Sequence, residues 1–267
     1  MQFNPALVFA VLPCLLYVQT HADDVTPLPR AHAHNDYLHE RPLLEALDNG
    51  FCSVEADIFL VDGKLLVAHT KHETSTHRTL QKLYLDPLWN HIKQNAGRVH
   101  KNGPAFILLI DIKSSGEETW QQLNKVLSGY SDILSRVEDG QFHQGVVTSI
   151  VSGDRAFDAI EATSTRYAGI DGRISDIGGG RPSHLMPLIS DNWRLYFRWR
   201  GKGEFPEKQR NKLHRLVRLA HEDNRRIRFW ASPDTPDTWQ ELNAAAADLI
   251  NTDDLSGLSE FLREHTE

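Results

Sequence analysis

The chain has 267 residues, of which 40% are hydrophobic and 24% are charged, and its formal net charge is -7. This length fits one barrel of about 250 residues or two smaller domains, and the composition excludes a disordered, collagen-like or coiled-coil protein. The acidic balance argues against a general binder of nucleic acids or anionic membranes, which needs a positive field. Fourteen histidines are the one unusual count, and we expect most of them to be solvated.

An apolar run over residues 5–18 is followed by small residues near Ala22. Its length is typical of the hydrophobic region of a signal peptide and is short for a membrane span. We therefore predict a Sec-type signal peptide over 1–22, export to the periplasm or the medium, and one folded domain over 23–267. A membrane anchor or a buried N-terminal helix is the alternative, because residues 1–4 carry no Lys or Arg. Cleavage leaves Cys52 as the single cysteine, which we interpret as a buried structural thiol.

Short apolar runs alternate with helical patterns along the rest of the chain. In order, the first half predicts a strand over 30–33, a helix over 42–49 ended by Gly50, strands over 53–60 and 64–68 joined by a turn at Asp62-Gly63, helices over 79–83 and 88–95, a strand over 106–112 and a helix over 116–127. The second half predicts strands over 145–151, 166–170, 188–190, 195–199, 227–230 and 249–251, and helices over 206–223, 235–246 and 255–264. A further helix, capped by Asp154, is predicted to reach about Ala162.

Repeated strand–helix units without a domain break predict a parallel α/β fold. The number of units is close to eight and the length matches, so we predict a single (β/α)8 TIM barrel. A doubly wound sheet is the alternative, but neither a Gly-x-Gly-x-x-Gly nor a P-loop sequence supports it. The run Gly178-Gly179-Gly180 lacks the required spacing, and we interpret it as a flexible loop.

Three carboxylates fall on two of the predicted strands. Glu55 and Asp57 are two residues apart on one strand, so both side chains point to the same face. Burying two carboxylates side by side is unfavourable without a cation, and hard oxygen ligands suit Mg²⁺ or Ca²⁺. Asp111 and Lys113 repeat this spacing at the end of the next long strand. A metal for Asp111 and a phosphate group for Lys113 would satisfy both side chains.

Two histidines, His34 and His69, lie near the same strand ends. In a barrel these ends converge on the face where active sites lie. Because both imidazoles titrate near neutral pH, one can act as a base and the other as an acid. Each motif alone is weak, since Glu-x-Asp on a strand is often a solvated pair. The order His, Glu-x-Asp, His, Asp-x-Lys on successive strands is much more specific.

On these residues the chain resembles the phospholipase C-like phosphodiesterase superfamily, which includes glycerophosphodiester phosphodiesterases and spider-venom phospholipase D. The segments His-Asn-Asp-Tyr, Ser-Val-Glu-Ala-Asp and Leu-Val-Ala-His are most similar to its altered-inheritance-of-mitochondria-protein-6-like subgroup. The resemblance implies a (β/α)8 barrel that binds one divalent cation, Mg²⁺ or Ca²⁺, through Glu55, Asp57 and Asp111. It also implies catalytic roles for His34, His69 and Lys113 and substrate contacts for Asn35 and Trp230.

The function implied is a metal-dependent phosphoric diester hydrolase acting on a glycerophosphodiester or a phospholipid-like head group. His34 is preferred as base or nucleophile and His69 as acid. We expect a monomer that binds no nucleic acid and does not insert stably into a membrane after signal cleavage. Glycerophosphodiesterases carry His-Arg-Gly where this chain has His34-Asn35-Asp36, and usually Glu where it has Asp111. Their small glycerol-holding insertion has no obvious counterpart, so the substrate stays open.

Two other functions compete with this interpretation. His32 and His34 form the His-x-His of zinc amidohydrolases, with Asp253 as a late ligand, but no histidine ends the predicted strands at Val151, Ile170 or Ser190. The second alternative is a barrel that binds a phosphate or lipid head group and has lost turnover.

Overall fold

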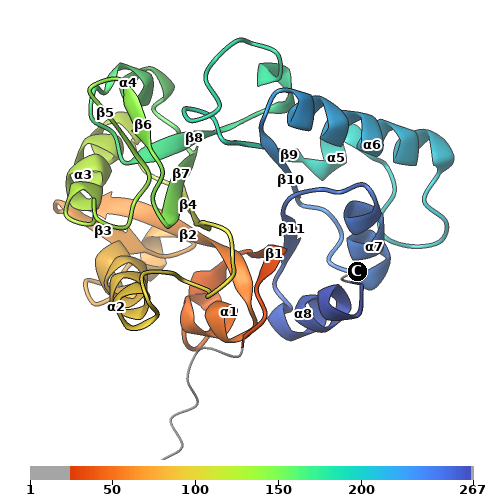
Figure 1. Ribbon diagram of the computed structural model, residues 1–267, viewed down its shortest axis with the longest axis horizontal. Helices are drawn as coiled ribbons and strands as arrows, with labels where there is room; N and C mark the ends of the chain where they lie inside the picture. Colours follow the sequence, from red (N-terminus) through yellow and green to blue (C-terminus); the bar gives the residue numbers. More distant parts are fainter. Residues whose placement is uncertain (1–24, 266–267) are drawn as a thin grey trace, which may run out of the picture.

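The computed structural model describes residues 25–265, so the predicted signal peptide lies outside the described residues. Eight strands run parallel to one another around a common centre, as Figure 1 shows. They are β1 (Leu28–Ala33), β2 (Phe51–Val61), β4 (Phe106–Ile112), β7 (Val147–Gly153), β8 (Ala168–Gly172), β9 (Leu188–Asn192), β10 (Arg226–Trp230) and β11 (Ile250–Thr252).

Hydrogen-bonded neighbours follow the order β10-β9-β8-β7-β4-β2-β1-β11. One parallel bridge, between Arg228 and Leu249, joins the two ends of this order and closes the ring. The short strand β3 (Lys64–Val67) pairs antiparallel with the end of β2 through the turn at Asp62 and Gly63, as predicted. The predicted (β/α)8 barrel is confirmed.

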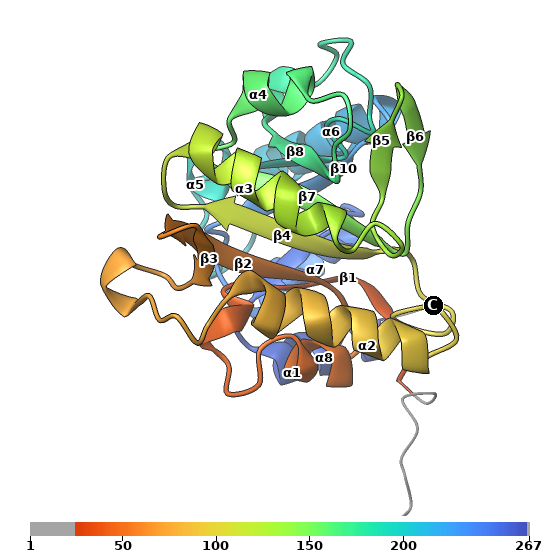
Figure 2. The same cartoon turned by 90° about the vertical axis from the view of Figure 1, so that its left-hand side faces the viewer.

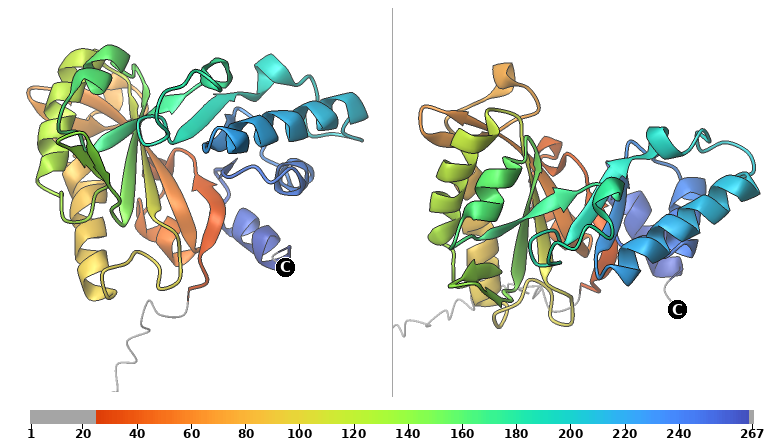
Figure 3. Two further views of the ribbon diagram at one scale, coloured as in Figure 1. Left: turned by 45° about the horizontal axis from the view of Figure 1, so that its top comes forward. Right: turned by 90° about the horizontal axis from the view of Figure 1, so that it is seen from above.

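Helices pack on the outside of the strands, with α2 and α3 on one side and α6, α7 and α8 on another (Figure 3). The α-helices are α1 (Leu44–Asp48), α2 (Asp86–Gln94), α3 (Gly116–Ser128), α4 (Phe157–Ala162), α5 (Trp193–Tyr196), α6 (Glu207–Glu222), α7 (Pro236–Ala244) and α8 (Leu255–Glu264). Short helical turns occur at η2 (Asp36–Leu38), η3 (Lys71–Glu73), η4 (Gln81–Leu85) and η5 (Ile174–Asp176). None of the helices within 25–265 is long and apolar enough to cross a membrane.

The alternation of side chains along the strands divides the core in two. On β4, Leu108 and Ile110 belong to the large core, which also includes apolar residues of the surrounding helices. Ile107 and Leu109 point the other way, into the lumen, where they meet Ile150, Leu188 and Leu249 in a separate apolar cluster. We call this lumen cluster the apolar plug. Asp111 is the next residue of β4 that faces the lumen, so its carboxylate lies beyond the plug, at the end of the strand.

Two local predictions were wrong, and both errors concern residues around turns. The run 195–199 was predicted as a strand, but Trp193–Tyr196 forms the short helix α5. The side chain of Asn192 caps this helix by accepting a hydrogen bond from the Arg194 N–H at 2.9 Å. Trp193 then packs on Phe197 four residues later, with ring centroids 4.1 Å apart. The cap and the aromatic contact therefore favour a helical turn over the strand that the apolar run predicts.

The second error concerns Asp154, which does not cap α4. Its carboxylate accepts a hydrogen bond from the Gly116 N–H at 2.9 Å, and it therefore satisfies the first turn of α3 instead. The structure also contains a hairpin that the sequence analysis missed, β5 (Arg136–Glu138) with β6 (Gln141–His143). Its turn is Asp139-Gly140, whose φ angles of 51° and 75° fit a tight hairpin.

Candidate active site

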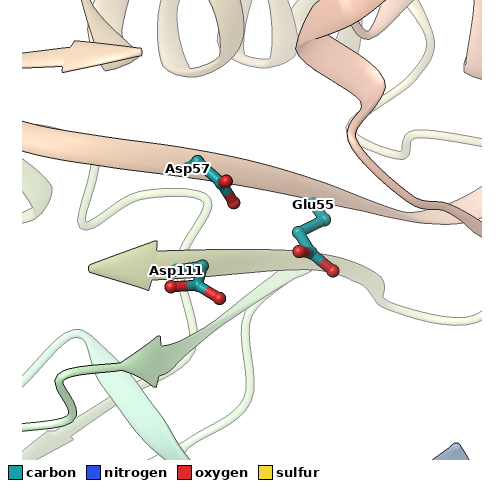
Figure 4. Close-up of side chains that lie close together, drawn as sticks. All are labelled: Glu55, Asp57 and Asp111. Carbon is teal, nitrogen blue, oxygen red and sulfur yellow. The ribbon is translucent and has the colours of Figure 1, made fainter. Parts of the chain in front are cut away.

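The three predicted metal ligands meet at the carboxyl-terminal end of the strands. Glu55 and Asp57 lie on β2, and Asp57 is directly opposite Asp111 in the register of β2 with β4. One carboxylate oxygen from each residue lies within 4.8 Å of the others. Figure 4 shows the three side chains pointing toward one another from the two neighbouring strands. The period-two spacing and the pairing of β2 with β4 are sufficient to bring them together.

The hydrogen bonds in this cluster leave two buried oxygens unused. Asp57 Oδ2 accepts from the Tyr37 hydroxyl at 2.8 Å and lies 3.2 Å from Lys113 Nζ. Asp111 Oδ2 lies 3.0 Å from the same ammonium group. The Oδ1 atoms of Asp57 and Asp111 are buried and have no hydrogen-bond partner within residues 25–265. Buried polar atoms are normally paired, so these two oxygens, together with Glu55, fit a hard divalent cation.

The electrostatics of the cluster agree with this fit. Burial raises the pKa of Asp57 to about 6, and the negative charge of Glu55 adds to the rise. Burial also raises the pKa of Asp111, although Lys113 acts against it. A bound cation would favour the charged form of both carboxylates and so offset these shifts.

Glu55 differs from the two aspartates because it already has a cationic partner. Its Oε2 accepts from Arg228 Nη2 at 2.6 Å and lies 3.4 Å from His32 Nε2, and all three residues are buried. Burial alone would raise the pKa of Glu55, but Arg228 and His32 outweigh this effect and lower it. Burial and the nearby Arg228 charge lower the pKa of His32 to about 3, so this imidazole is neutral. His32 also contacts Ser53 Oγ through Nδ1 at 2.7 Å, which uses both ring nitrogens.

Sequence reasoning missed Arg228. One signal could have found it: Arg226, Arg228 and Trp230 alternate on a strand whose other residues are apolar, so all three face the lumen. The partner of Arg228 was not predictable by this route, because Glu55 is 173 residues away.

His34 is held by its Nδ1 atom. This nitrogen lies 2.8 Å from Asp253 Oδ1, beyond the end of β11, and 3.1 Å from Asn35 Nδ2. Burial tends to lower the pKa of His34, but the hydrogen bond to Asp253 and the charge of Glu55 outweigh it and raise the pKa. The Nε2 atom has no partner in the described part of the chain, so it is available to a substrate.

His69, like His34, is held through its Nδ1 atom, but by different residues. Its Nδ1 lies 3.0 Å from the hydroxyl of Tyr37 and 3.5 Å from Asp57 Oδ2. The side chain is 55% exposed, and its Nε2 is also without a partner within 25–265. The buried Tyr37 hydroxyl also lies 2.8 Å from Asn35 Oδ1, so its single proton can go to Asn35 or to Asp57. The polar atoms of His34, Asn35, Tyr37 and His69 are therefore in contact in series.

The two predicted substrate contacts have different positions. Asn35 sits in a left-handed conformation with φ 48° and bonds to His34 and Tyr37, which makes it a positioning residue in this structure. Trp230 ends β10 and is 36% exposed, an unusually open position for a large aromatic side chain. Nothing else in the described residues makes a ring contact with Trp230. Both residues follow or end a strand at the carboxyl-terminal end of the barrel, and their contact with a substrate stays a prediction.

The geometry does not favour the zinc alternative. His32 points to Ser53 and Glu55, whereas His34 points to Asp253, so the two imidazoles have different partners. Within 25–265, the single group of three potential metal-binding side chains is the carboxylate cluster.

Comparisons with known proteins agree with this architecture. Residues 19–170 match the family model described as the AIM6-like phosphodiesterase domain. Altered inheritance of mitochondria protein 6 homolog from Arthroderma benhamiae is 28% identical, over 87% of this chain and 83% of the relative. Altered inheritance of mitochondria protein 6 from Eremothecium gossypii is also 28% identical, over 89% of this chain and 70% of the relative.

Two solved structures share the fold. A glycerophosphodiester phosphodiesterase from Parabacteroides distasonis superposes with a TM-score of 0.55 at 13% identity, covering 91% of this chain and all of that one. A glycerophosphoryl diester phosphodiesterase from the same organism gives 0.52 at 12% identity, covering 90% and 88%. At these identities the likeness concerns the fold alone, whereas the family match spans more than half of the sequence. The chain therefore belongs to the AIM6-like phosphodiesterase family.

Proposed function

We propose that the protein is a phosphoric diester hydrolase that uses one divalent cation, Mg²⁺ or Ca²⁺. One observation carries the proposal: two buried carboxylate oxygens without partners lie beside two histidines that are each held through Nδ1. Three carboxylates for a cation, an ammonium group and two free Nε2 atoms can together supply charge stabilisation, a base and an acid for cleavage of a phosphodiester. The family match and the phosphodiesterase folds support the same reaction class.

Glu55, Asp57 and Asp111 would hold the cation. When bound, it supplies Lewis-acid stabilisation of the negative charge on non-bridging phosphate oxygens. Lys113 Nζ, which lies between Asp57 and Asp111, adds a second positive charge for the same oxygens. Arg228 keeps Glu55 ionised and fixed in place.

The histidines carry the protons in this proposal. His34 Nε2 takes the proton of the attacking water or substrate hydroxyl, or attacks the phosphorus itself, and Asp253 stabilises the imidazolium that forms. His69 Nε2 donates a proton to the leaving alcohol, while its Nδ1 remains bonded to Tyr37. Asn35 contacts both His34 and Tyr37, and it sets the orientation of the His34 ring.

The substrate proposed is a glycerophosphodiester or a phospholipid-like head group. Trp230 supplies an exposed apolar surface at the strand ends for the part of the substrate outside the phosphate. We further propose that the protein is exported by the segment 1–22, acts as a monomer, and binds no nucleic acid. The apolar run at 5–18 supports export, and the acidic net charge argues against binding of nucleic acid.

Hydrolysis of bis(p-nitrophenyl) phosphate, followed by release of p-nitrophenol, tests the proposal. We expect activity with Mg²⁺ or Ca²⁺, loss of activity in EDTA, and recovery when either ion is restored. His34→Ala removes the base and should lower kcat by at least about 100-fold. A panel of natural diesters, tested in parallel, then identifies the head group.

His214→Ala is the matched control, because His214 is an exposed histidine on α6. It should leave kcat unchanged. Absence of hydrolysis with every diester and both ions contradicts the proposal, as does equal activity of His34→Ala and the native protein. Activity that instead tracks stoichiometric zinc favours the amidohydrolase alternative.

A further inference from the structure

A hollow lies at the amino-terminal ends of the strands, at the end of the barrel opposite the carboxylate cluster. It has a volume of about 880 Å³, and its walls come from the starts of β4, β7 and β10, from β6 and from the loops before β9 and β11. The apolar plug formed by Ile107, Leu109, Ile150, Leu188 and Leu249 lies in the lumen between this cavity and the carboxylates. Figure 2 shows the hairpin β5–β6 at the end opposite the arrowhead of β4.

The cavity contains a cation that the protein leaves without a partner. Arg226 begins β10 and is partly exposed, and its guanidinium makes no hydrogen bond or ion pair with any residue of 25–265. The neighbouring Arg225 differs: its guanidinium donates to Asp223 and to the backbone oxygens of Met186 and Arg181.

The carboxylate that lines the cavity, Asp248, is engaged through its Oδ2 atom and makes no ion pair with Arg226. Asp248 accepts from the Ile227 N–H at 2.9 Å, and the same oxygen lies 2.8 Å from His221 Nε2. Arg226 is therefore an available positive charge in a concave site of a protein whose net charge is -7. Half-buried guanidinium groups normally pair with oxyanions, so the unpaired one is suited to an external anion.

An aromatic wall faces the same cavity. Phe142, on β6, is 42% exposed and stacks on His184, with ring centroids 5.5 Å apart and planes 10° from parallel. The buried Arg166 donates to His184 Nδ1 at 2.9 Å and fixes the plane of that ring. The hairpin thus presents a flat, preorganised apolar surface next to the unpaired guanidinium.

We propose that this cavity binds a small amphipathic anion, with an oxyanion group on Arg226 and an apolar or aromatic part against Phe142 and Pro187. A phosphate and a carboxylate share the required chemistry. The site is separate from the carboxylate cluster and does not depend on the proposed hydrolase activity.

Methyl NMR of the full-length protein tests the site, with phenylphosphonate and benzoate as probes. The Ile107 and Ile150 methyl groups line the cavity and report occupancy locally. We expect both probes to shift these signals saturably, and phenol, which lacks the anionic group, to bind at least about tenfold more weakly. Arg226→Gln should raise the dissociation constant of both anions at least about tenfold, with no change in melting temperature.

Three further variants make the outcomes decisive. Arg215→Gln removes an exposed arginine of α6 that does not line the cavity, and Lys113→Gln alters only the site at the opposite end; both should leave the constants unchanged. Phe142→Ser should weaken the aryl anions more than inorganic phosphate. Methyl signals that do not move, or equal affinities for native protein and Arg226→Gln, overturn the proposal. Binding that responds to Lys113→Gln alone assigns the anion to the catalytic end instead.

Discussion

Aspartates lie at equivalent heights on two sides of the barrel, but they differ in how many hydrogen-bond partners their carboxylate oxygens have. Asp57 and Asp111, on β2 and β4, each keep one buried oxygen without a partner. Asp171, on β8, is buried like Asp57 and more deeply than Asp111, yet both of its oxygens are used. Ser190 donates to Oδ1, while Ser152 at 2.7 Å and Arg173 at 3.0 Å donate to Oδ2. Burial raises the pKa of Asp171 even so, with Arg173 acting against the rise.

This difference in hydrogen bonding distinguishes Asp171, whose carboxylate stabilises the fold, from Asp57 and Asp111, whose free oxygens are available to a ligand. Asp36 also has a buried oxygen, Oδ1, without a partner within residues 25–265, but it belongs to no cluster of carboxylates there. Its Oδ2 accepts from the Tyr84 hydroxyl and the Leu43 N–H. A free oxygen therefore indicates a cation site only where several carboxylates converge. The variants below test this distinction.

The largest contrast is expected between Asp57→Asn and Asp171→Asn. The first removes a proposed metal ligand and should lower kcat/KM at least about 1,000-fold, with a free energy of unfolding within about 1 kcal/mol of native. The second replaces one of two fully used acceptor oxygens by an NH₂ donor and removes the charge that faces Arg173, and it should cost about 3 kcal/mol of stability with less than a tenfold loss of activity. Urea unfolding and diester hydrolysis measure both effects. A loss mainly of stability in Asp57→Asn and mainly of activity in Asp171→Asn would contradict the comparison.

Gly153→Ala should damage the cluster through packing. A Cβ at this position would overlap Asp111 Oδ1 and the carbonyl oxygen of Ile112, and the backbone has φ +70°. We expect a loss of about 3 kcal/mol in unfolding free energy and weaker binding of Mg²⁺. Gly140→Ala is the control, since φ is +75° there and no atom lies within 4 Å of the added methyl. It should cost only about 1 kcal/mol, and equal losses in the two variants would rule out the steric explanation.

Asp36→Asn should change the pH dependence of stability. Burial raises the pKa of Asp36 to about 6, above its ordinary value of 3.8. The folded state therefore binds the proton more tightly, and the stability this provides is complete below about pH 4 and lost as the pH rises through 6. Asn cannot titrate, so the variant should gain on the order of 2 kcal/mol relative to native protein between pH 4 and pH 7. Denaturant unfolding at the two pH values measures the difference, and a constant difference contradicts the assignment.

The smallest effect is expected for Asp253→Asn, which acts on His34 alone. Its carboxylate contributes to the raised pKa of His34, so its removal should lower that pKa. The acid limb of the kcat/KM profile should shift to lower pH by the same amount, and titration of the His34 ring protons by NMR provides an independent check. Asp237→Asn, on the exposed surface of α7, should shift neither.

Sequence reasoning recovered the parts of the site that depend on local periodicity. Glu55, Asp57 and Asp111 were predictable because strand alternation fixes their faces and parallel strands align their ends. The strand 106–112 and the helix 255–264 were predicted with the bounds that the structure has. In each case a single regular pattern, uninterrupted by turns, determines the element.

What escaped prediction depends on contacts between distant residues or on the geometry of turns. Tyr37 reaches Asp57 and His69 only because the turn η2 brings it back over the strand ends. The pairing of Arg228 with Glu55 requires the ring to close. The true roles of Asn192 and Asp154 as caps follow from which N–H groups lie nearby, and that is a tertiary property.

The single bridge between Arg228 and Leu249 has a dynamic consequence. At this seam the Leu249 N–H donates to the carbonyl oxygen of Ile227, and the next residue, Arg228, extends its side chain to Glu55. Transient opening of this seam would break the contact that fixes a carboxylate of the cluster. Local opening and occupancy of the cluster should therefore be thermodynamically linked, so that ions bound there slow amide hydrogen exchange along β10 and β11.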